Sequence, residues 1–334
     1  MRQLRFEPYH ELAGVPNVIV DGGPTESTEL TLSHWPGSPT PIDLLDDLSA
    51  QISLRALDHP TLFDGIEVVS NNHFDQDGLA SAFALIHPVD AIQRRERTVD
   101  VARAGDFATY HDRDSMRIAF AIAALADATR STLDAAIFDG TYDEQSGRLY
   151  QSLLPRFAEL IDHPERSRSL WEAEDAHLTE SLLAIERGIV TLEENRRLDL
   201  VTVTVPEHWA QRTTTRFALT RHEAVHPAAI HQSSDRLRVV TIQGRRQCVE
   251  MRYESWVMYR SRPVAPRPDL RILAAHLDEV AAGATTWQAT GPGSLTPILR
   301  PVDDESALAP HRFVALVEEF LTVATPAWDP LQPR

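Results

Sequence analysis

The sequence predicts an α/β protein with a doubly wound, mostly parallel sheet, a helical middle section and a second, smaller α+β domain. Three observations carry this prediction. Short apolar strands alternate with helical segments in the first third, apolar residues recur with a helical period through the middle, and alternating β-branched residues follow Leu200. We place the domain boundary near residue 195, so that 1–195 forms the α/β domain and 196–334 the substrate domain.

The first third contains three short strands and two helices. Strands are predicted where apolar runs end in turns or polar residues, at 16–21, 30–37 and 65–70. Pro41 suits the first turn of a helix over 42–57, and a second helix is expected over 79–86. Repeated strand–turn–helix units of this kind favour a parallel sheet.

The middle of the chain is helical and the last third is mixed. Helices are expected where apolar residues keep the 3.6-residue period, over 113–130, 131–162 and 167–195. Further strands are expected over 199–205 and 216–219, and a hairpin around Gly244 from 236–242 and 247–253. A helix over 270–282 follows a proline-rich connection.

The residue composition excludes several classes of mechanism. The chain has 334 residues, with 49 Asp+Glu against 32 Lys+Arg, all of them arginine, and a formal net charge of -17. Without lysine, neither Schiff-base chemistry nor a standard P-loop can operate. The acidic balance disfavours long nucleic acid as a partner and is compatible with a small anionic substrate bridged by metal.

The sequence also lacks the signals of secreted and membrane proteins. No segment approaches the roughly 20 apolar residues that span a bilayer, and the N-terminus has no signal-peptide pattern. The single cysteine, Cys248, excludes an internal disulfide. We therefore expect a cytoplasmic protein with no membrane partner, and a homodimer is compatible with the sequence.

Polar residues follow all three strands of the first third. Asp21 ends the first strand, His34 follows the second, and the third runs into Asn-Asn-His-Phe-Asp-Gln-Asp-Gly at 71–78. The carboxyl ends of parallel strands face one crevice, so these groups converge if the strands are neighbours.

The segment 71–78 is the strongest candidate site. In an extended chain His73, Asp75 and Asp77 point the same way, and one imidazole with two carboxylates suits Mn²⁺ or another divalent cation such as Mg²⁺. Gly78 then allows a tight turn into the next helix. The alternative is that Asp77 only caps that helix, while His73 and Asp75 are surface residues.

Residues Val69 to Ser81 resemble the first motif of the DHH phosphoesterase superfamily, in which an apolar strand ends in His-x-Asp-x-Asp-Gly before a helix of small residues. The resemblance implies a doubly wound N-terminal domain, a Mn²⁺ pair and hydrolysis of a phosphodiester or phosphoanhydride. It would make His73, Asp75 and Asp77 metal ligands. The Asp-His-His triplet of that superfamily is absent, and the chain as a whole resembles an uncharacterised bacterial family with no assigned activity.

Two further segments supply candidate residues. Asp106, in a segment dense in potential ligands, is the expected carboxylate that completes the metal site. His222 to His226 match the HExxH letters of a zinc metalloprotease, which stays an alternative, but Pro227 opposes a helix that continues past the second histidine. We instead expect Arg221, with His222 or His226, to hold an anion in a cleft between the halves.

The leading hypothesis is a metal-dependent hydrolase that acts on a small phosphorylated substrate. The expected catalytic residues and metal ligands are His73, Asp75, Asp77 and Asp106, and the expected substrate-binding residues are Asn72, Arg221, His222 and His226. Two alternatives stay open. One is a metal-dependent enzyme of small-molecule metabolism without phosphoryl transfer, and the other is a non-catalytic ligand-binding module on the same fold.

Overall fold

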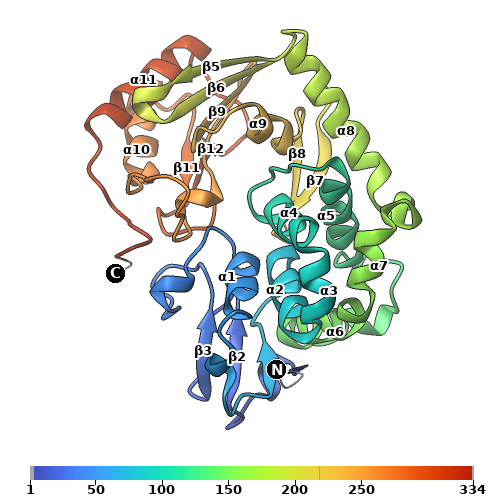
Figure 1. Cartoon of the computed structure of the whole chain (residues 1–334). Coiled ribbons are helices and arrows are strands. Elements are labelled where there is room, and N and C mark those ends of the chain that lie inside the picture. Colours follow the sequence, from blue (N-terminus) through green and yellow to red (C-terminus); the bar gives the residue numbers. More distant parts are fainter. Residues whose placement is uncertain (1–3, 218, 333–334) are drawn as a thin grey trace. The chain divides into compact units, whose positions relative to one another are not determined.

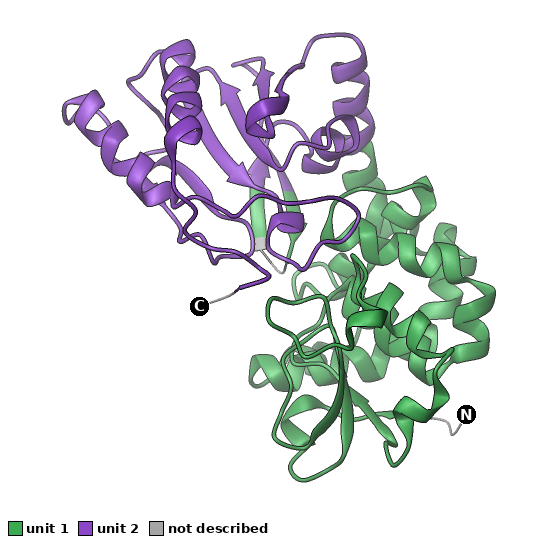
Figure 2. Cartoon of the chain, turned by 60° about the vertical axis from the view of Figure 1, so that its left-hand side comes forward, with its two compact units in different colours: residues 1–176, 214–221 green, residues 177–213, 222–334 purple. Residues whose placement is uncertain are grey.

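The computed structural model describes residues 4–217 and 219–332. The chain forms two compact units (Figure 2), and we call residues 1–176 with 214–221 unit 1 and residues 177–213 with 222–334 unit 2.

The division between the units falls inside helix α8 (Arg168–Glu186), whereas the sequence placed a boundary near residue 195. Buried residues such as Trp171, Leu178 and Ser181, at spacings of seven and three residues, continue the helical period across this point. Because the helical pattern of buried residues is continuous from unit 1 into unit 2, no local sequence signal marks the division between them.

Unit 1 is built on a four-stranded sheet in which the described strands all pair in parallel (Figure 1). Its spatial order is β1-β4-β2-β3, formed by β1 (Arg5–Phe6), β2 (Asn17–Val20), β3 (Thr28–Leu32) and β4 (Val68–Ser70). The central strand β2 is buried along its whole length, with Val18 opposite Leu30 on one side and Val69 on the other. The predicted α/β fold with a parallel sheet is confirmed.

Helices make up the rest of unit 1. They are α1 (Ser49–Ala56), α2 (Gln76–Ile86), α3 (Pro88–Gln93), α4 (Arg95–Asp106), α5 (Arg113–Leu125), α6 (Tyr142–Leu153), α7 (Phe157–Asp162) and the first half of α8. Helix α2 packs against both α1 and α4, and α4 packs against α5 (Figure 1). Within residues 4–217 and 219–332, no helix is both long and apolar enough to cross a membrane.

The helix expected over 42–57 is shorter in the structure. Ile42–Leu44 forms a single 3-10 turn, and α1 begins only at Ser49. The carboxylate of Asp77 accepts hydrogen bonds from the backbone amides of Ser49 and Ala50, and this sets the start of the helix. A cap supplied from 28 residues further along the chain leaves no local sequence signal.

The helix expected over 167–195 is wrong at its C-terminal end. Helix α8 ends at Glu186, and Gly188 takes a left-handed conformation with a φ of 67° that lets the chain turn away. Residues Thr191–Asn195 then form strand β5, which pairs antiparallel with β6 (Leu200–Val205).

Unit 2 contains a six-stranded mixed sheet of order β11-β12-β10-β9-β6-β5. Its remaining strands are β9 (Arg238–Gln243), β10 (Arg246–Met251), β11 (Trp287–Ala289) and β12 (Ile298–Pro301), and only β6 and β9 pair in parallel. Strands β9 and β10 form the hairpin expected around Gly244. Two more strands, β7 (Arg212–Arg216) and β8 (Leu219–Glu223), form a separate two-stranded sheet.

Two helices cover the sheet of unit 2. Leu273 and Leu277 of α10 (Leu270–Ala281) and Phe313 of α11 (Pro310–Val323) are buried in one cluster with Val240 and Val249 of the sheet. A third, short helix, α9 (Pro227–Ser233), follows β8.

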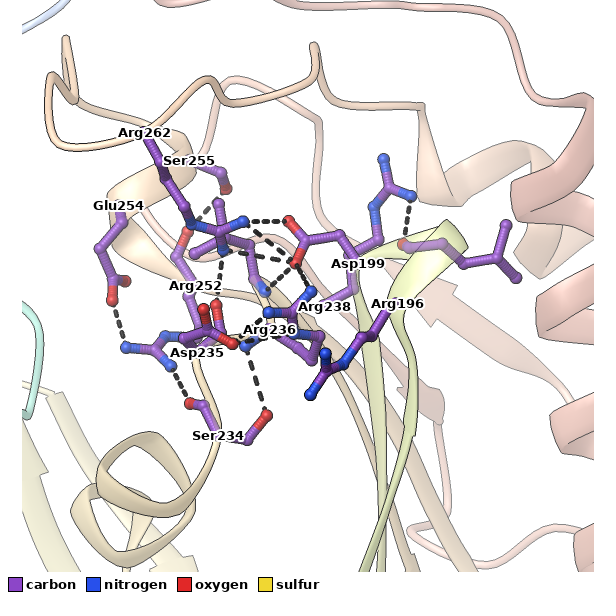
Figure 3. A network of polar contacts seen from close by, with 12 residues as sticks. Arg196, Asp199, Ser234, Asp235, Arg236, Arg238, Arg252, Glu254, Ser255 and Arg262 are labelled. Atoms are coloured by element: carbon purple, nitrogen blue, oxygen red, sulfur yellow. Dashed lines mark hydrogen bonds and ion pairs between the residues drawn. The ribbon is translucent and has the colours of Figure 1, made fainter.

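An arginine-rich network joins several segments of unit 2 (Figure 3). Asp199, just before β6, accepts hydrogen bonds of 3.3 to 3.4 Å from Arg262, and Arg236 Nη1 lies 3.6 Å from its Oδ1 atom. Arg252 forms a buried ion pair with Glu254. These guanidinium groups therefore hold neighbouring segments of the unit together, which is a structural role.

Candidate metal centre

The carboxyl ends of three neighbouring strands meet at one edge of the unit 1 sheet. Asp21 follows β2 directly, His34 lies just beyond β3, and Asn71 begins the segment after β4. Because β2 pairs in parallel with both β3 and β4, all three ends point to the same edge. The convergence that the sequence suggested is present in the structure.

The inner part of the centre surrounds the imidazole of His34, which is completely buried. Its Nε2 atom lies 3.4 Å from Asp21 Oδ1, 3.5 Å from Asp106 Oδ2 and 3.8 Å from Asp77 Oδ2. All three carboxylates are buried as well. One imidazole and three carboxylates thus face one another away from solvent, and Asp106 reaches the group from the last residue of α4.

The backbone sets the tautomer of His34. Its Nδ1 atom lies 2.5 Å from the carbonyl oxygen of Asp47, so Nδ1 carries the proton and donates it. Burial lowers the pKa of His34 to about 4 against the opposing effects of Asp47 and Asp75, and the ring is neutral at pH 7. The lone pair on Nε2 then faces the oxygens of three carboxylates. These groups repel one another unless a proton or a cation lies between the imidazole and the carboxylates.

The outer part of the centre pairs His73 with Asp75. The Nε2 atom of His73 lies 3.1 Å from Asp75 Oδ2, and its ring centroid lies 5.1 Å from that of Trp35. Asp75 is the N-cap of α2, and its Oδ1 atom accepts a hydrogen bond of 2.8 Å from the Gly78 amide. Burial raises the pKa of Asp75, but the charge and the hydrogen bond of His73 outweigh it and hold the pKa below its ordinary value.

Asp21 belongs to both parts of the centre. Its Oδ1 atom faces His34 and accepts a hydrogen bond of 2.8 Å from Ser49 Oγ, whereas its Oδ2 atom lies 3.5 Å from His73 Nε2. The two histidines therefore flank one carboxylate, with one oxygen directed to each.

Buried negative charge dominates this cluster. Burial, together with the charges of Asp75, Asp77 and Asp106, raises the pKa of Asp21 well above its ordinary value. Burial and the charge of Asp75 also raise the pKa of Asp77 to about 7. In the described part of the chain, the ion pairs of Asp21, Asp75 and Asp77 are all with histidines and none is with an arginine.

Two sets of side chains in the centre have the donor types and spacing of a metal site. In each set three ligand atoms lie within 4.8 Å of one another, and the sets are Asp21, His34 and Asp77, and Asp21, His73 and Asp75. Carboxylate oxygens with one imidazole suit Mn²⁺ and similar divalent cations, and a cation would offset the buried negative charge. The donor set therefore fits a pair of cations that share Asp21.

The placement of Asp77 differs from the extended segment that the sequence suggested. Asp77 lies in the first turn of α2, so it does not alternate with His73 and Asp75 along one strand face. It turns to the inner group instead, and its two oxygens accept hydrogen bonds of 2.8 Å from the Ser49 amide and 2.7 Å from the Ala50 amide. The helix that Asp77 caps is therefore α1, and Asp75 caps its own helix α2.

Two glycines permit the close packing of this segment. A Cβ atom on Gly78 would lie 2.3 Å from Tyr150 Oη and 2.4 Å from Asn71 Nδ2, and one on Gly22 would lie 2.3 Å from Asn72 Oδ1. A Cβ atom at either position would force the neighbouring side chain to shift, so glycine allows the observed close packing. Tyr150, on α6, is a neighbour of the motif that the sequence interpretation missed.

Nearly the whole chain matches a family model. Residues 2–332 match the model described as "Family of unknown function (DUF6687)". The chain belongs to this family. A comparison with curated proteins and one with solved structures each found no match.

The segment that matches HExxH does not form a zinc-binding helix. His222 and Glu223 lie in strand β8, and His226 is the N-cap of α9 with Pro227 in its first turn. A histidine pair on one helical turn is thus absent, as the proline suggested. Arg221 lies in β8 beside the exposed His222, whereas His226 is buried in unit 2.

Arg216, the last residue of β7, is a cation that the sequence interpretation missed. It belongs to unit 1, and its guanidinium donates a hydrogen bond to the backbone carbonyl of Asp106. The guanidinium also lies over the ring of Phe217, at 4.5 Å from the centroid. Positive charge is thereby placed beside one carboxylate residue of the inner group.

Proposed function

We propose that unit 1 is a metal-dependent hydrolase centre for a small phosphorylated substrate, with Mn²⁺ or Mg²⁺ as its cofactor. The observation that carries the proposal is Asp21, shared between the His34 and His73 groups. Two cations close together can clamp the attacking and leaving oxygens of a phosphoryl group. The resemblance of residues 69–81 to the first DHH motif supports the same reaction class.

The chain itself would position the reacting groups. The Asp47 carbonyl holds His34 in the tautomer that exposes Nε2 to the cluster, and the Gly78 amide fixes Asp75. Cations bound here would supply a water of lowered pKa and stabilise charge on the attacked phosphoryl group. Arg216, beside Asp106, would bind an anionic oxygen of the substrate. A cytoplasmic location suits a chain whose single cysteine is Cys248.

Metal content tests the first half of this proposal. We expect the purified full chain to bind two Mn²⁺ per molecule in equilibrium dialysis, and Asp75→Asn combined with Asp77→Asn to abolish most of this binding. Asp64→Asn is the matched control, because Asp64 is exposed and lies outside the cluster. Equal metal content in the wild type and the double variant would end the proposal.

A substrate panel tests the second half. We expect Mn²⁺-dependent release of phosphate or nitrophenol from pyrophosphate, p-nitrophenyl phosphate or bis(p-nitrophenyl) phosphate, and no release by the double variant. Metal binding without turnover of any panel member would favour a metal enzyme that performs no phosphoryl transfer. Neither binding nor turnover would favour a non-catalytic ligand-binding module.

A further inference from the structure

Unit 2 contains a pocket of about 510 Å³, a volume within the range of small-molecule sites. It lies between the second half of α8, the segment that joins β6 to β7, and Ala224 after β8. All of its lining residues belong to unit 2, whereas the candidate metal ligands belong to unit 1. The proposed hydrolase centre therefore gives this pocket no role.

Several apolar residues line the pocket. They include Leu183, Ala184, Ile189 and Trp209. Leu183 and Ile189 are 39% and 50% exposed, which is high for large apolar side chains. An apolar ligand would cover this surface and gain from its burial.

Two arginines are among the polar residues that line the pocket. Arg187 lines the pocket, and no described residue forms an ion pair or hydrogen bond with its side chain. Arg212 also lines the pocket, but its guanidinium is paired with Glu180. An unpaired guanidinium at an apolar pocket, in a chain of net charge -17, favours an anionic group on the ligand.

A rigid pair of imidazoles supports the pocket. His177 is 3% exposed, lines the pocket and packs edge-to-face on His226, with ring centroids 5.4 Å apart. The backbone amide of His226 donates to Ser181 Oγ at 3.0 Å, and its Nδ1 atom accepts a hydrogen bond of 3.1 Å from the Ala228 amide. These contacts hold the His177–His226 pair in place, and a part of the pocket that is ordered before binding lowers the entropic cost of binding.

We propose that this pocket binds a small organic anion with an apolar body, its carboxylate or sulfonate at Arg187 and its apolar part against Leu183, Ile189 and Trp209. A charged head and an apolar body match the arginine and the apolar residues that line the pocket. The site is independent of the metal centre, so it stands whether or not unit 1 hydrolyses phosphate.

Fluorescence titration with 8-anilinonaphthalene-1-sulfonate tests the proposal, because this probe combines an aromatic body with a sulfonate. We expect saturable binding to the folded full chain, displacement by octanoate and much weaker displacement by octylammonium. Arg187→Gln should weaken binding about tenfold, since a charge-assisted hydrogen bond is lost. Arg196→Gln, which changes a guanidinium that is 84% exposed elsewhere in unit 2, should leave it unchanged.

A second variant tests the shape of the pocket without changing its charge. Ala210 is exposed and lines the pocket, so Ala210→Trp should narrow the site and weaken probe binding without disturbing the core. Circular dichroism and the unfolding midpoint check that each variant is folded. Wild-type affinity in both Arg187→Gln and Ala210→Trp would overturn the proposal, as would equal weakening by Arg196→Gln or equal displacement by octanoate and octylammonium.

Discussion

The Oδ1 atom of Asp21 lies 3.4 Å from the Nε2 atom of His34, in a part of unit 1 from which solvent is excluded. The other oxygen of the same carboxylate lies 3.5 Å from His73 Nε2. A neutral imidazole opposite a carboxylate offers only acceptor atoms to the space between them, so the pair is stable where a proton or cation fills it. We therefore expect Asp21 to be the position at which metal binding is most sensitive to substitution.

Asp21→Asn should reduce Mn²⁺ binding at both sets of ligands, because both include Asp21. Asparagine keeps the shape and one acceptor oxygen but loses the charge, so the metal-free variant should be at least as stable as the wild type. Equilibrium dialysis measures the first effect and urea unfolding the second. Unchanged Mn²⁺ stoichiometry would show that Asp21 is not a shared ligand.

The buried carboxylates make the stability of the metal-free protein depend on pH. The folded-state pKa of Asp77 is about 7 against an ordinary 3.8, so the folded chain holds a proton that the unfolded chain releases between these values. The free energy of unfolding of chelator-treated protein should therefore fall as pH rises from about 4 to about 7, by up to about 4 kcal/mol from this group.

Asp77→Asn provides the comparison for this pH dependence, because other acidic groups also contribute to it. Urea unfolding of both proteins in a chelator should give a flatter pH profile for Asp77→Asn, and saturating Mn²⁺ should flatten the wild-type profile. Parallel profiles for the two chelated proteins would show that Asp77 titrates normally in the folded state.

The contribution of the Asp77 cap of α1 to stability can be measured separately from the effect of the Asp77 charge. At about pH 5 the carboxyl is largely protonated, so Asp77→Ala mainly removes the acceptors for the Ser49 and Ala50 amides. We expect the free energy of unfolding to fall by about 1–2 kcal/mol in metal-free protein, as for other lost N-caps. Asp77→Asn keeps one acceptor oxygen, so its free energy of unfolding should fall less than that of Asp77→Ala. If Asp77→Ala were as stable as the wild type, Asp77 would not act as a cap for α1.

The meeting of the strand ends could be predicted from the sequence, because it depends on local features. Apolar runs at 16–21 and 65–70 ended in Asp21 and in the His73 segment, and the parallel-sheet rule put both at one edge. The links between helices could not be predicted in this way. The contact of Asp77 with Ser49 joins residues 28 apart, and no short-range pattern encodes it.

Substituting Gly78 tests the packing around the motif. Gly78→Ala would put a methyl group against Tyr150 Oη and Asn71 Nδ2, so we expect a loss of about 1–3 kcal/mol in the free energy of unfolding. Tyr150→Phe removes the hydroxyl and should recover part of this loss in the double variant. Gly23→Ala is the control, because no atom lies within 4 Å of its added Cβ and its stability should be close to wild type.

We expected Arg221 to bind the anion, and we propose Arg216 for this role because of its place beside Asp106. The guanidinium of Arg216 donates to the backbone carbonyl of Asp106, whose carboxylate lies 3.5 Å from His34 Nε2. Positive charge here would attract a phosphorylated substrate and contributes no metal ligand. If the proposed hydrolysis holds, Arg216→Ala should raise KM about tenfold or more while Mn²⁺ stoichiometry stays unchanged. Arg300→Ala, at an exposed arginine of unit 2, should change neither KM nor Mn²⁺ stoichiometry. An unchanged KM in Arg216→Ala would contradict the role of Arg216 and make Arg221 the next candidate.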